Sequence, residues 1–316
     1  MRTLYPDIKP FDRQMLDVGD GHRLYIDQSG RQDAHPVLFL HGGPGNGCEF
    51  DSRRFFDPNQ YRIVLLDQRG SGRSEPLGET SVNSLDDLIR DIESIRAHLG
   101  LDRWALFGGG WGSTLALSYA EAFPEHVSGM VLRSPFLGRK QDIEWIYGDG
   151  LNRFYPDQWR EFCAPLEDGV DPIEGYQALM GAQNELGRMD AAKRFAAWEA
   201  ECSNLRPDAR LVQHLTKAPR ALSRCRIGTH YYANDCFLAP NQLLDHAHRL
   251  TGIPGYIVQG RFDLVTPPEA ALALAQAWPG SELFMVREAG HSATEPAMID
   301  ALVRSTERLA DRLNAG

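Results

Sequence analysis

The sequence has few cysteines, no paired metal-ligand motif and no long apolar run. Its five cysteines in 316 residues are odd in number and never spaced as Cys-x-x-Cys, which favours reduced thiols over a disulfide framework. No stretch approaches the roughly 18 apolar residues of a membrane span, and the N-terminus carries no apolar signal segment. We therefore expect a cytoplasmic protein without a metal, a cofactor or a membrane partner.

Basic charge is also scarce. Acidic residues outnumber basic ones by 43 to 33, which gives a net charge of -10. Such a surface repels phosphate backbones, so nucleic acid is not an expected partner. The mix of 42% hydrophobic and 24% charged residues is that of a globular protein, and the length suits one large domain or a core with an insertion.

Strand and helix signals alternate along the first half of the chain and again near its end. Short apolar runs typical of buried strands are separated by amphipathic segments typical of helices. This alternation predicts an α/β fold with a mostly parallel sheet covered by helices on both faces. We predict a hairpin at 15–26, strands at 36–40, 61–66, 104–107, 127–132, 255–259 and 282–286, and helices at 84–99, 111–123, 268–278 and 293–313.

The stretch 138–239 has a different character. Apolar β-branched runs disappear, and tryptophans alternate with charged residues, which indicates several amphipathic helices. Because strand signals resume after it, we interpret this stretch as an inserted helical cap. The predicted domains are a core formed by 1–137 and 240–316 and a cap formed by 138–239.

Four motifs follow predicted strands, where open α/β sheets collect function. The loop 41–45 (His-Gly-Gly-Pro-Gly) could supply backbone donors to an oxyanion. The segment 108–112 has the frame of a nucleophile elbow, normally Gly-x-Ser-x-Gly, but carries Gly110 at its centre. Asp263 and His291 each follow a later strand. The order elbow, Asp, His is that of an α/β-hydrolase triad.

These motifs closely resemble those of the prolyl iminopeptidases, together with 67–74 (Asp-Gln-Arg-Gly-Ser-Gly-Arg-Ser), and the likeness runs nearly end to end. The resemblance implies an α/β hydrolase with a helical cap that releases an N-terminal residue, typically proline, from a peptide or cleaves a related small amide or ester. It also implies a triad of the elbow position, Asp263 and His291, with an oxyanion hole formed by the N–H groups of Gly43 and Trp111.

The chain departs from the family pattern at three positions. The nucleophilic serine of the family falls on Gly110, which has no side chain. The family has a glutamate where this chain has Gly228, so of the two carboxylates that hold a substrate amino group only Glu199 remains. An aromatic pair of the family becomes Ile146-Tyr147. Two further family pocket residues, Arg133 and Phe136, are matched.

Two interpretations of Gly110 remain open. The chain is either a serine hydrolase inactivated by loss of its nucleophile, or a natural pseudoenzyme or non-hydrolytic catalyst that binds a small ligand under the cap and uses His291 as a base. Ser113 lies one turn into the following helix, and we expect it to serve packing rather than nucleophilic attack. In either case His291 should be hydrogen-bonded to Asp263, which would fix its tautomer.

Overall fold

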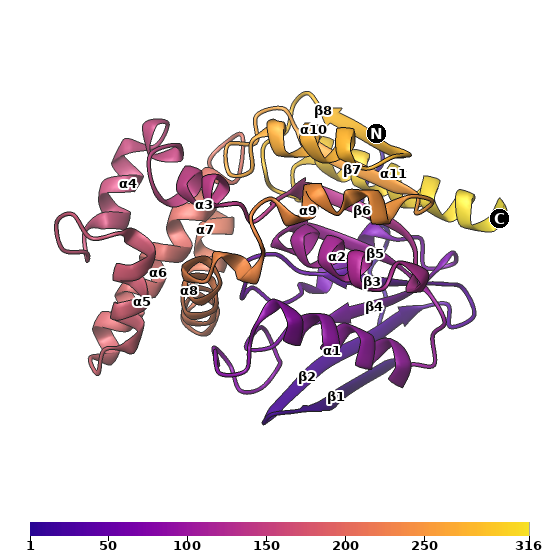
Figure 1. Ribbon diagram of the computed structural model, residues 1–316, viewed down its shortest axis with the longest axis horizontal. Helices are drawn as coiled ribbons and strands as arrows, with labels where there is room; N and C mark the ends of the chain where they lie inside the picture. The colour runs from indigo at the N-terminus through magenta and orange to yellow at the C-terminus, as the bar shows by residue number, and fades with distance from the viewer. Residues whose placement is uncertain (316) are drawn as a thin grey trace.

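An eight-stranded sheet forms the centre of the computed structural model, which describes residues 1–315 (Figure 1). The strand order is β1-β2-β4-β3-β5-β6-β7-β8. β1 and β2 pair antiparallel at one edge, and β2 also pairs antiparallel with β4. The remaining strands, β3 to β8, all run parallel to one another. The strands are β1 (Asp12–Gly19), β2 (His22–Gly30), β3 (His35–Leu40), β4 (Tyr61–Leu66), β5 (Trp104–Gly110), β6 (Val127–Pro135), β7 (Gly255–Gly260) and β8 (Ser281–Val286).

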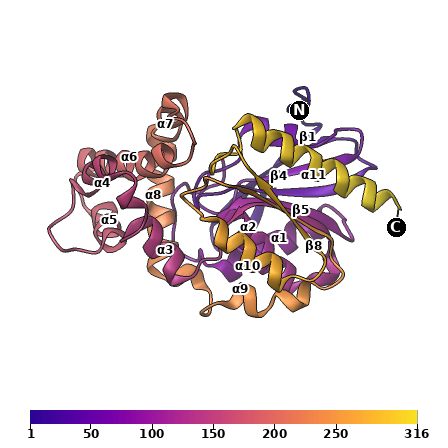
Figure 2. The same cartoon turned by 90° about the horizontal axis from the view of Figure 1, so that it is seen from above.

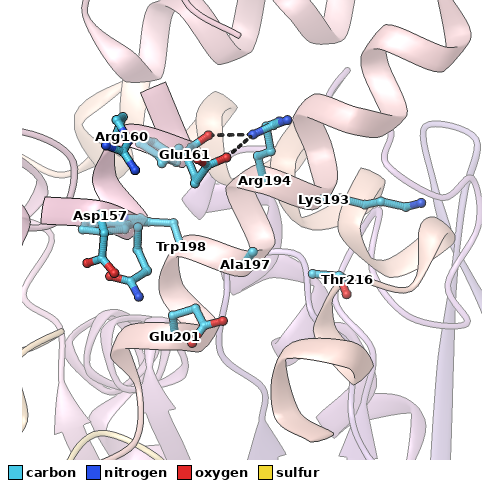
Figure 3. A pocket seen from close by; sticks show the side chains of 11 residues that line it. Asp157, Arg160, Glu161, Lys193, Arg194, Ala197, Trp198, Glu201 and Thr216 are labelled. Carbon is cyan, nitrogen blue, oxygen red and sulfur yellow. Dashed lines mark hydrogen bonds and ion pairs between the residues drawn. The ribbon is translucent and has the colours of Figure 1, made fainter. Parts of the chain in front are cut away.

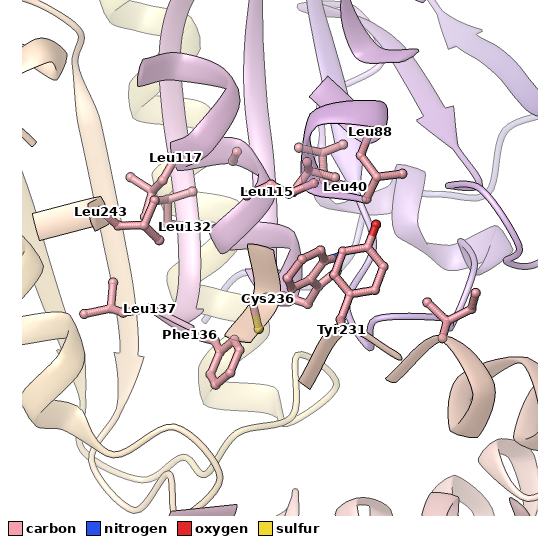
Figure 4. Packing of buried hydrophobic residues seen from close by; sticks show 14 of the residues in the cluster. Leu40, Leu88, Leu115, Leu117, Leu132, Phe136, Leu137, Tyr231, Cys236 and Leu243 are labelled. Carbon is pink, nitrogen blue, oxygen red and sulfur yellow. The ribbon is translucent and has the colours of Figure 1, made fainter. Parts of the chain in front are cut away.

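Helices cover both faces of this sheet, as predicted. α11 lies over one face, and α1, α2 and α10 lie over the other (Figure 2). Successive residues of one strand therefore enter different cores: Ile63 of β4 packs with the α11 side, and Val64 packs with the α1 and α2 side. Figure 4 shows part of the latter core, including Leu88 of α1 and Leu115 of α2. The helices are α1 (Leu85–His98), α2 (Trp111–Ala122), α9 (Gln242–Asp245), α10 (Pro268–Ala277) and α11 (Pro296–Ala315).

The predicted strands are all present, and the main differences lie at their ends. β1 and β2 extend beyond the predicted hairpin because their pairing continues as far as Asp12 and Gln28. β5 continues past Phe107 to Gly110, since its ladder with β6 persists through the three glycines. Glycine disfavours strands by propensity, and here pairing with the neighbouring strand outweighs that preference.

The chain between β6 and β7 is helical and contains no strand among the described residues. Its six longer helices gather at one end of the molecule, beside the carboxyl ends of the parallel strands (Figure 1). α8 touches the sheet loops directly, because Ser223 Oγ donates to the carbonyls of Gly45 at 3.1 Å and Gly70 at 2.6 Å. The helices are α3 (Lys140–Tyr147), α4 (Pro156–Cys163), α5 (Pro172–Gly181), α6 (Glu185–Cys202), α7 (Ala209–Leu215) and α8 (Ala218–Ala233).

Aromatic side chains form the centre of this helical segment. Phe162 stacks on Tyr176 with ring centroids 4.8 Å apart, and Trp198 lies 5.6 Å from Phe162. The predicted helical content of 138–239 is therefore confirmed, while the division into two domains stays a prediction. No described helix is long and apolar enough to cross a bilayer.

Candidate active site

A sharp turn joins β5 to α2 at Gly110, which has φ +55° and ψ -118°. The flanking glycines are required by space, since a Cβ on Gly112 would lie 2.1 Å from the Leu40 carbonyl oxygen and one on Gly108 would lie 2.2 Å from that of Gly112. A Cβ on Gly110 would instead meet only the His291 ring, at 3.7 Å from Cε1 and Nε2. Position 110 therefore has room for a side chain, and that side chain would face His291.

Asp263 and His291 come together from the loops that follow β7 and β8. His291 Nδ1 lies 3.0 Å from Asp263 Oδ2, so the predicted hydrogen bond is confirmed. Asp263 is 1% exposed, and its other oxygen accepts from the backbone N–H groups of Val265 at 3.0 Å and Thr266 at 2.9 Å. These backbone donors fix the carboxylate in the position from which it orients the imidazole.

The two side chains differ in how their surroundings shift protonation. Burial lowers the pKa of His291, and the nearby cations Arg133 and Arg224 lower it further, against the opposing charge of Asp263. Burial tends to raise the pKa of Asp263, but His291 and several hydrogen bonds reverse this and hold that pKa below its ordinary value. A neutral imidazole beside an ionised carboxylate must donate from Nδ1, which leaves the Nε2 lone pair facing position 110.

The loop 41–45 is tied to the start of α2 by Gln68. Its Nε2 donates to the His41 carbonyl oxygen at 2.9 Å, and its Oε1 accepts from Trp111 Nε1 at 2.9 Å. Gly43 has φ +123°, and a Cβ there would lie 2.6 Å from the Gly45 nitrogen, so only glycine fits. The segment 67–74 was noticed in the sequence as a family motif, but its spacing gave no sign of this bridging role.

Arg133 packs beneath the turn. A Cβ on Gly109 would lie 2.4 Å from its Nη2, and its Nη1 donates to the His291 carbonyl oxygen. Burial lowers the pKa of Arg133 to about 10. Ser113 is fully buried and donates to the Gly108 carbonyl oxygen at 3.0 Å, which confirms the packing role predicted for it.

A cavity of about 240 Å³ joins these elements. Its lining includes Gly43, Gly110, Trp111 and His291 from the strand ends, Arg133 near the end of β6 and Phe136 just after it. α3, α6 and α8 supply Ile146, Glu199, Arg224 and Tyr232. Most of the site residues predicted from the sequence therefore line this one cavity. The exceptions are Asp263, which lies behind His291, and two further residues.

Those two are Tyr147 and Gly228, which do not line this cavity. A Cβ on Gly228 would lie 3.3 Å from Phe195 Cε1 and 3.6 Å from Tyr232 Cε2, so this position lies behind Tyr232, which lines the cavity. Tyr147 is stacked on the same Phe195 ring, with centroids 5.4 Å apart. Its hydroxyl donates to Glu199 and its ring packs against Tyr232, so it supports the lining from behind.

Glu199 has a partner that the sequence did not predict. It forms a buried ion pair with Arg224, and Arg224 also donates to Asn46. The two residues are 25 positions apart on different helices, α6 and α8, so no local sequence pattern could predict the pair. The only available signal was the position of Arg224 one helical turn before Gly228.

A larger cavity of about 560 Å³ lies between α4 and α6 (Figure 3). Its lining contains Trp198, Glu201 and Lys193, and its ion pair joins Arg194 to Glu161 at 3.1 Å. None of the residues at the strand ends lines it. The smaller of these two cavities therefore holds the candidate active site.

Residues 35–296 match the alpha/beta hydrolase fold family, the class that the sheet order and the strand-end site define. A proline iminopeptidase from Xylella fastidiosa is 45% identical over 97% of this chain and 99% of its own length. One from Arabidopsis thaliana is 43% identical over 98% of this chain and 82% of its own. The chain therefore belongs to the proline iminopeptidase family of α/β hydrolases.

Solved structures share the fold at low sequence identity. A proline iminopeptidase-related protein from Thermus thermophilus superposes with a TM-score of 0.61 at 22% identity, covering 98% of both chains. An esterase from Exiguobacterium antarcticum gives a TM-score of 0.61 at 20% identity over 96% of this chain and 98% of its own. At such identities the likeness establishes the fold alone.

Proposed function

We propose that this chain is the scaffold of a serine hydrolase that cleaves a small peptide, amide or ester, present here without its nucleophile. One observation carries the proposal: a side chain placed on Gly110 would begin 3.7 Å from His291 Nε2 without a steric clash, at a positive φ of the kind that a nucleophile elbow imposes on its serine. A serine there would have its hydroxyl beside a neutral imidazole that Asp263 already orients. The helical segment 138–239 would act as the cap over this site.

With serine at position 110, the reaction would follow the course of serine hydrolases. His291 Nε2 would take the hydroxyl proton as the oxygen attacks the substrate carbonyl, and would return that proton to the leaving amine or alcohol. The N–H groups of Gly43 and Trp111 would hold the oxyanion. A water molecule, deprotonated in turn by His291, would then hydrolyse the acyl-enzyme to the acid.

Without that serine, the site retains only a base and oxyanion donors. A water in the space above Gly110 would have to be activated by His291 directly, which gives slow hydrolysis because no acyl-enzyme divides the reaction into two easier steps. The second candidate function is a ligand-binding pseudoenzyme or a non-hydrolytic catalyst with His291 as base. It is favoured by Gly228 and Ile146, which depart from the family pattern at substrate-binding positions just as Gly110 departs from it at the nucleophile.

The test is the Gly110→Ser variant, assayed with prolyl and alanyl arylamides and esters. Because loss of a triad serine costs on the order of 10⁶ in turnover, we expect a gain of several orders of magnitude over the unchanged chain. The matched control is Gly110→Ser with His291→Ala, which should lose that gain. A Gly110→Ser protein that folds but cleaves none of these arylamides and esters would contradict the proposal and favour the pseudoenzyme.

A further inference from the structure

The carboxylate expected to meet a substrate amino group is already neutralised by the protein. Glu199 is 8% exposed and Arg224 is 4% exposed, and the two form an ion pair. The Tyr147 hydroxyl donates to the same carboxylate. An incoming ammonium group would have to displace the guanidinium or share its counter-ion, and either costs free energy because the pair is shielded from water.

The side chains that line the cavity include more guanidinium groups than carboxylates, while the ionised Asp263 lies behind His291 and outside the lining. The lining contains the carboxylates Glu49 and Glu199 and the guanidinium groups Arg133, Arg220 and Arg224. Glu49 forms an ion pair with Arg220, as Glu199 does with Arg224. Arg133 has no carboxylate partner among the described residues and makes its hydrogen bond to a backbone carbonyl. The lining is therefore suited to an anion or a neutral acceptor.

Arg224 has hydrogen-bonding capacity left over. A guanidinium has five N–H donors, and the described residues supply partners only to Nη1, from Asn46, and to Nη2, from Glu199. An unpaired buried donor is costly, and a protonated amine cannot relieve it because an ammonium group offers only donors. A carbonyl or carboxylate oxygen would satisfy it. The position beside Glu199 thus calls for an acceptor on the ligand.

We propose that this site selects acyl groups with an acceptor oxygen next to Arg224, such as N-acylated or carboxylate-bearing compounds, and discriminates against a free amino terminus. The inference rests on the proposed function for the location of the site, and it reverses the charge preference expected from a pair of free glutamates. Arg224 would be the residue that determines this specificity.

Binding to the unchanged chain tests the proposal without any turnover. Calorimetry at about pH 6, where an α-amino group is protonated, would compare prolinamide, N-acetylprolinamide and N-succinylprolinamide. One charge-assisted contact is worth roughly a factor of ten to a hundred. We therefore expect N-acetylprolinamide to bind about tenfold or more tighter than prolinamide. Tighter binding of the succinyl compound than of the acetyl compound would identify a carboxylate as the preferred acceptor, and equal binding a carbonyl.

Variants at Arg224 sharpen the test. Arg224→Ala frees Glu199 and should reverse the preference toward prolinamide, whereas Arg226→Ala, on the same helix but outside the cavity lining, should leave it unchanged. If Arg224→Ala does not fold, the double variant Arg224→Gln with Glu199→Gln removes both charges together and should abolish the preference.

The proposal is overturned if prolinamide binds the unchanged chain as tightly as the acetyl compound, if no ligand binds, or if the preference survives loss of Arg224. These outcomes are separate from those of the proposed function. Turnover by Gly110→Ser with a preference for free amines would refute only the specificity. A binding preference without any turnover would refute only the hydrolase.

Discussion

The two sides of the cavity are built in different ways. On the strand edge (Gly110, Asp263 and His291), the backbone sets the geometry: a glycine-locked turn and two backbone N–H groups fix the position of each element. On the helical wall (Glu199 and Arg224), the key contact joins two side chains from α6 and α8.

This difference shows how reaction chemistry and recognition can separate. Geometry that depends on the backbone persists when a single side chain is lost, and the Asp263–His291 hydrogen bond is present although position 110 has no nucleophile. A contact between side chains changes with one substitution, so the helical wall can alter its charge preference while the strand edge stays intact.

The prediction with the largest expected effect concerns the strand edge, where a substitution should lower the reaction rate without changing the substrate preference. In the Gly110→Ser background, Asp263→Asn should lower kcat by about 10⁴-fold, because an amide favours the wrong imidazole tautomer. The loss should be the same for N-blocked and free-amine substrates. Steady-state kinetics on both substrates would check this.

The matched change on the helical wall is Arg224→Ala in the same background. It should alter the ratio of kcat/KM values for the two substrates by about tenfold or more and leave the rate of the better one within a few-fold. If Asp263→Asn changed the substrate ratio as strongly as Arg224→Ala does, the two sides would not be separable.

A second prediction compares stability. Gly112→Ala should lower the free energy of unfolding by about 3 kcal/mol or more, because its Cβ would overlap a backbone carbonyl that cannot move aside. Gly228→Ala, in a helix and 3.3 Å from a Phe195 ring edge, should cost less than about 1 kcal/mol, since alanine favours the helix by a similar amount. Denaturant unfolding of both variants would measure the difference, and equal losses would contradict it.

The prediction with the smallest expected effect concerns the influence of the Arg224 charge, on the helical wall, on the pKa of His291, on the strand edge. Activity of the Gly110→Ser variant needs neutral His291, whose pKa is held below its ordinary value. The rate should therefore stay level at pH 7 and fall about tenfold per unit only below that lowered pKa. Arg224 is one of the cations that lower this pKa, so Arg224→Ala should move the acidic limb upward. A pH–rate profile that did not move would show that the helical wall has no electrostatic influence on the base.

The sequence was most informative where local pattern decides structure. The apolar run 61–66 predicted β4 with the correct first and last residue, because a strand buried on both faces needs continuous apolar residues. The order of elbow, Asp263 and His291 predicted their approach, since parallel strands end at one edge of the sheet. The pairing of Glu199 with Arg224 could not be predicted, because it depends on how α6 and α8 pack. For the same reason, Gly228 and Tyr147 were expected in the pocket and instead lie behind its lining.

Gln68 joins the loop 41–45 to the start of α2 with one planar amide group, through the His41 carbonyl oxygen on one side and the Trp111 indole on the other. The amide cannot stretch, so it acts as a spacer of fixed width between the loop 41–45 and the start of α2. In the proposed reaction, the N–H groups of Gly43 and Trp111 would therefore keep the same separation for every substrate carbonyl.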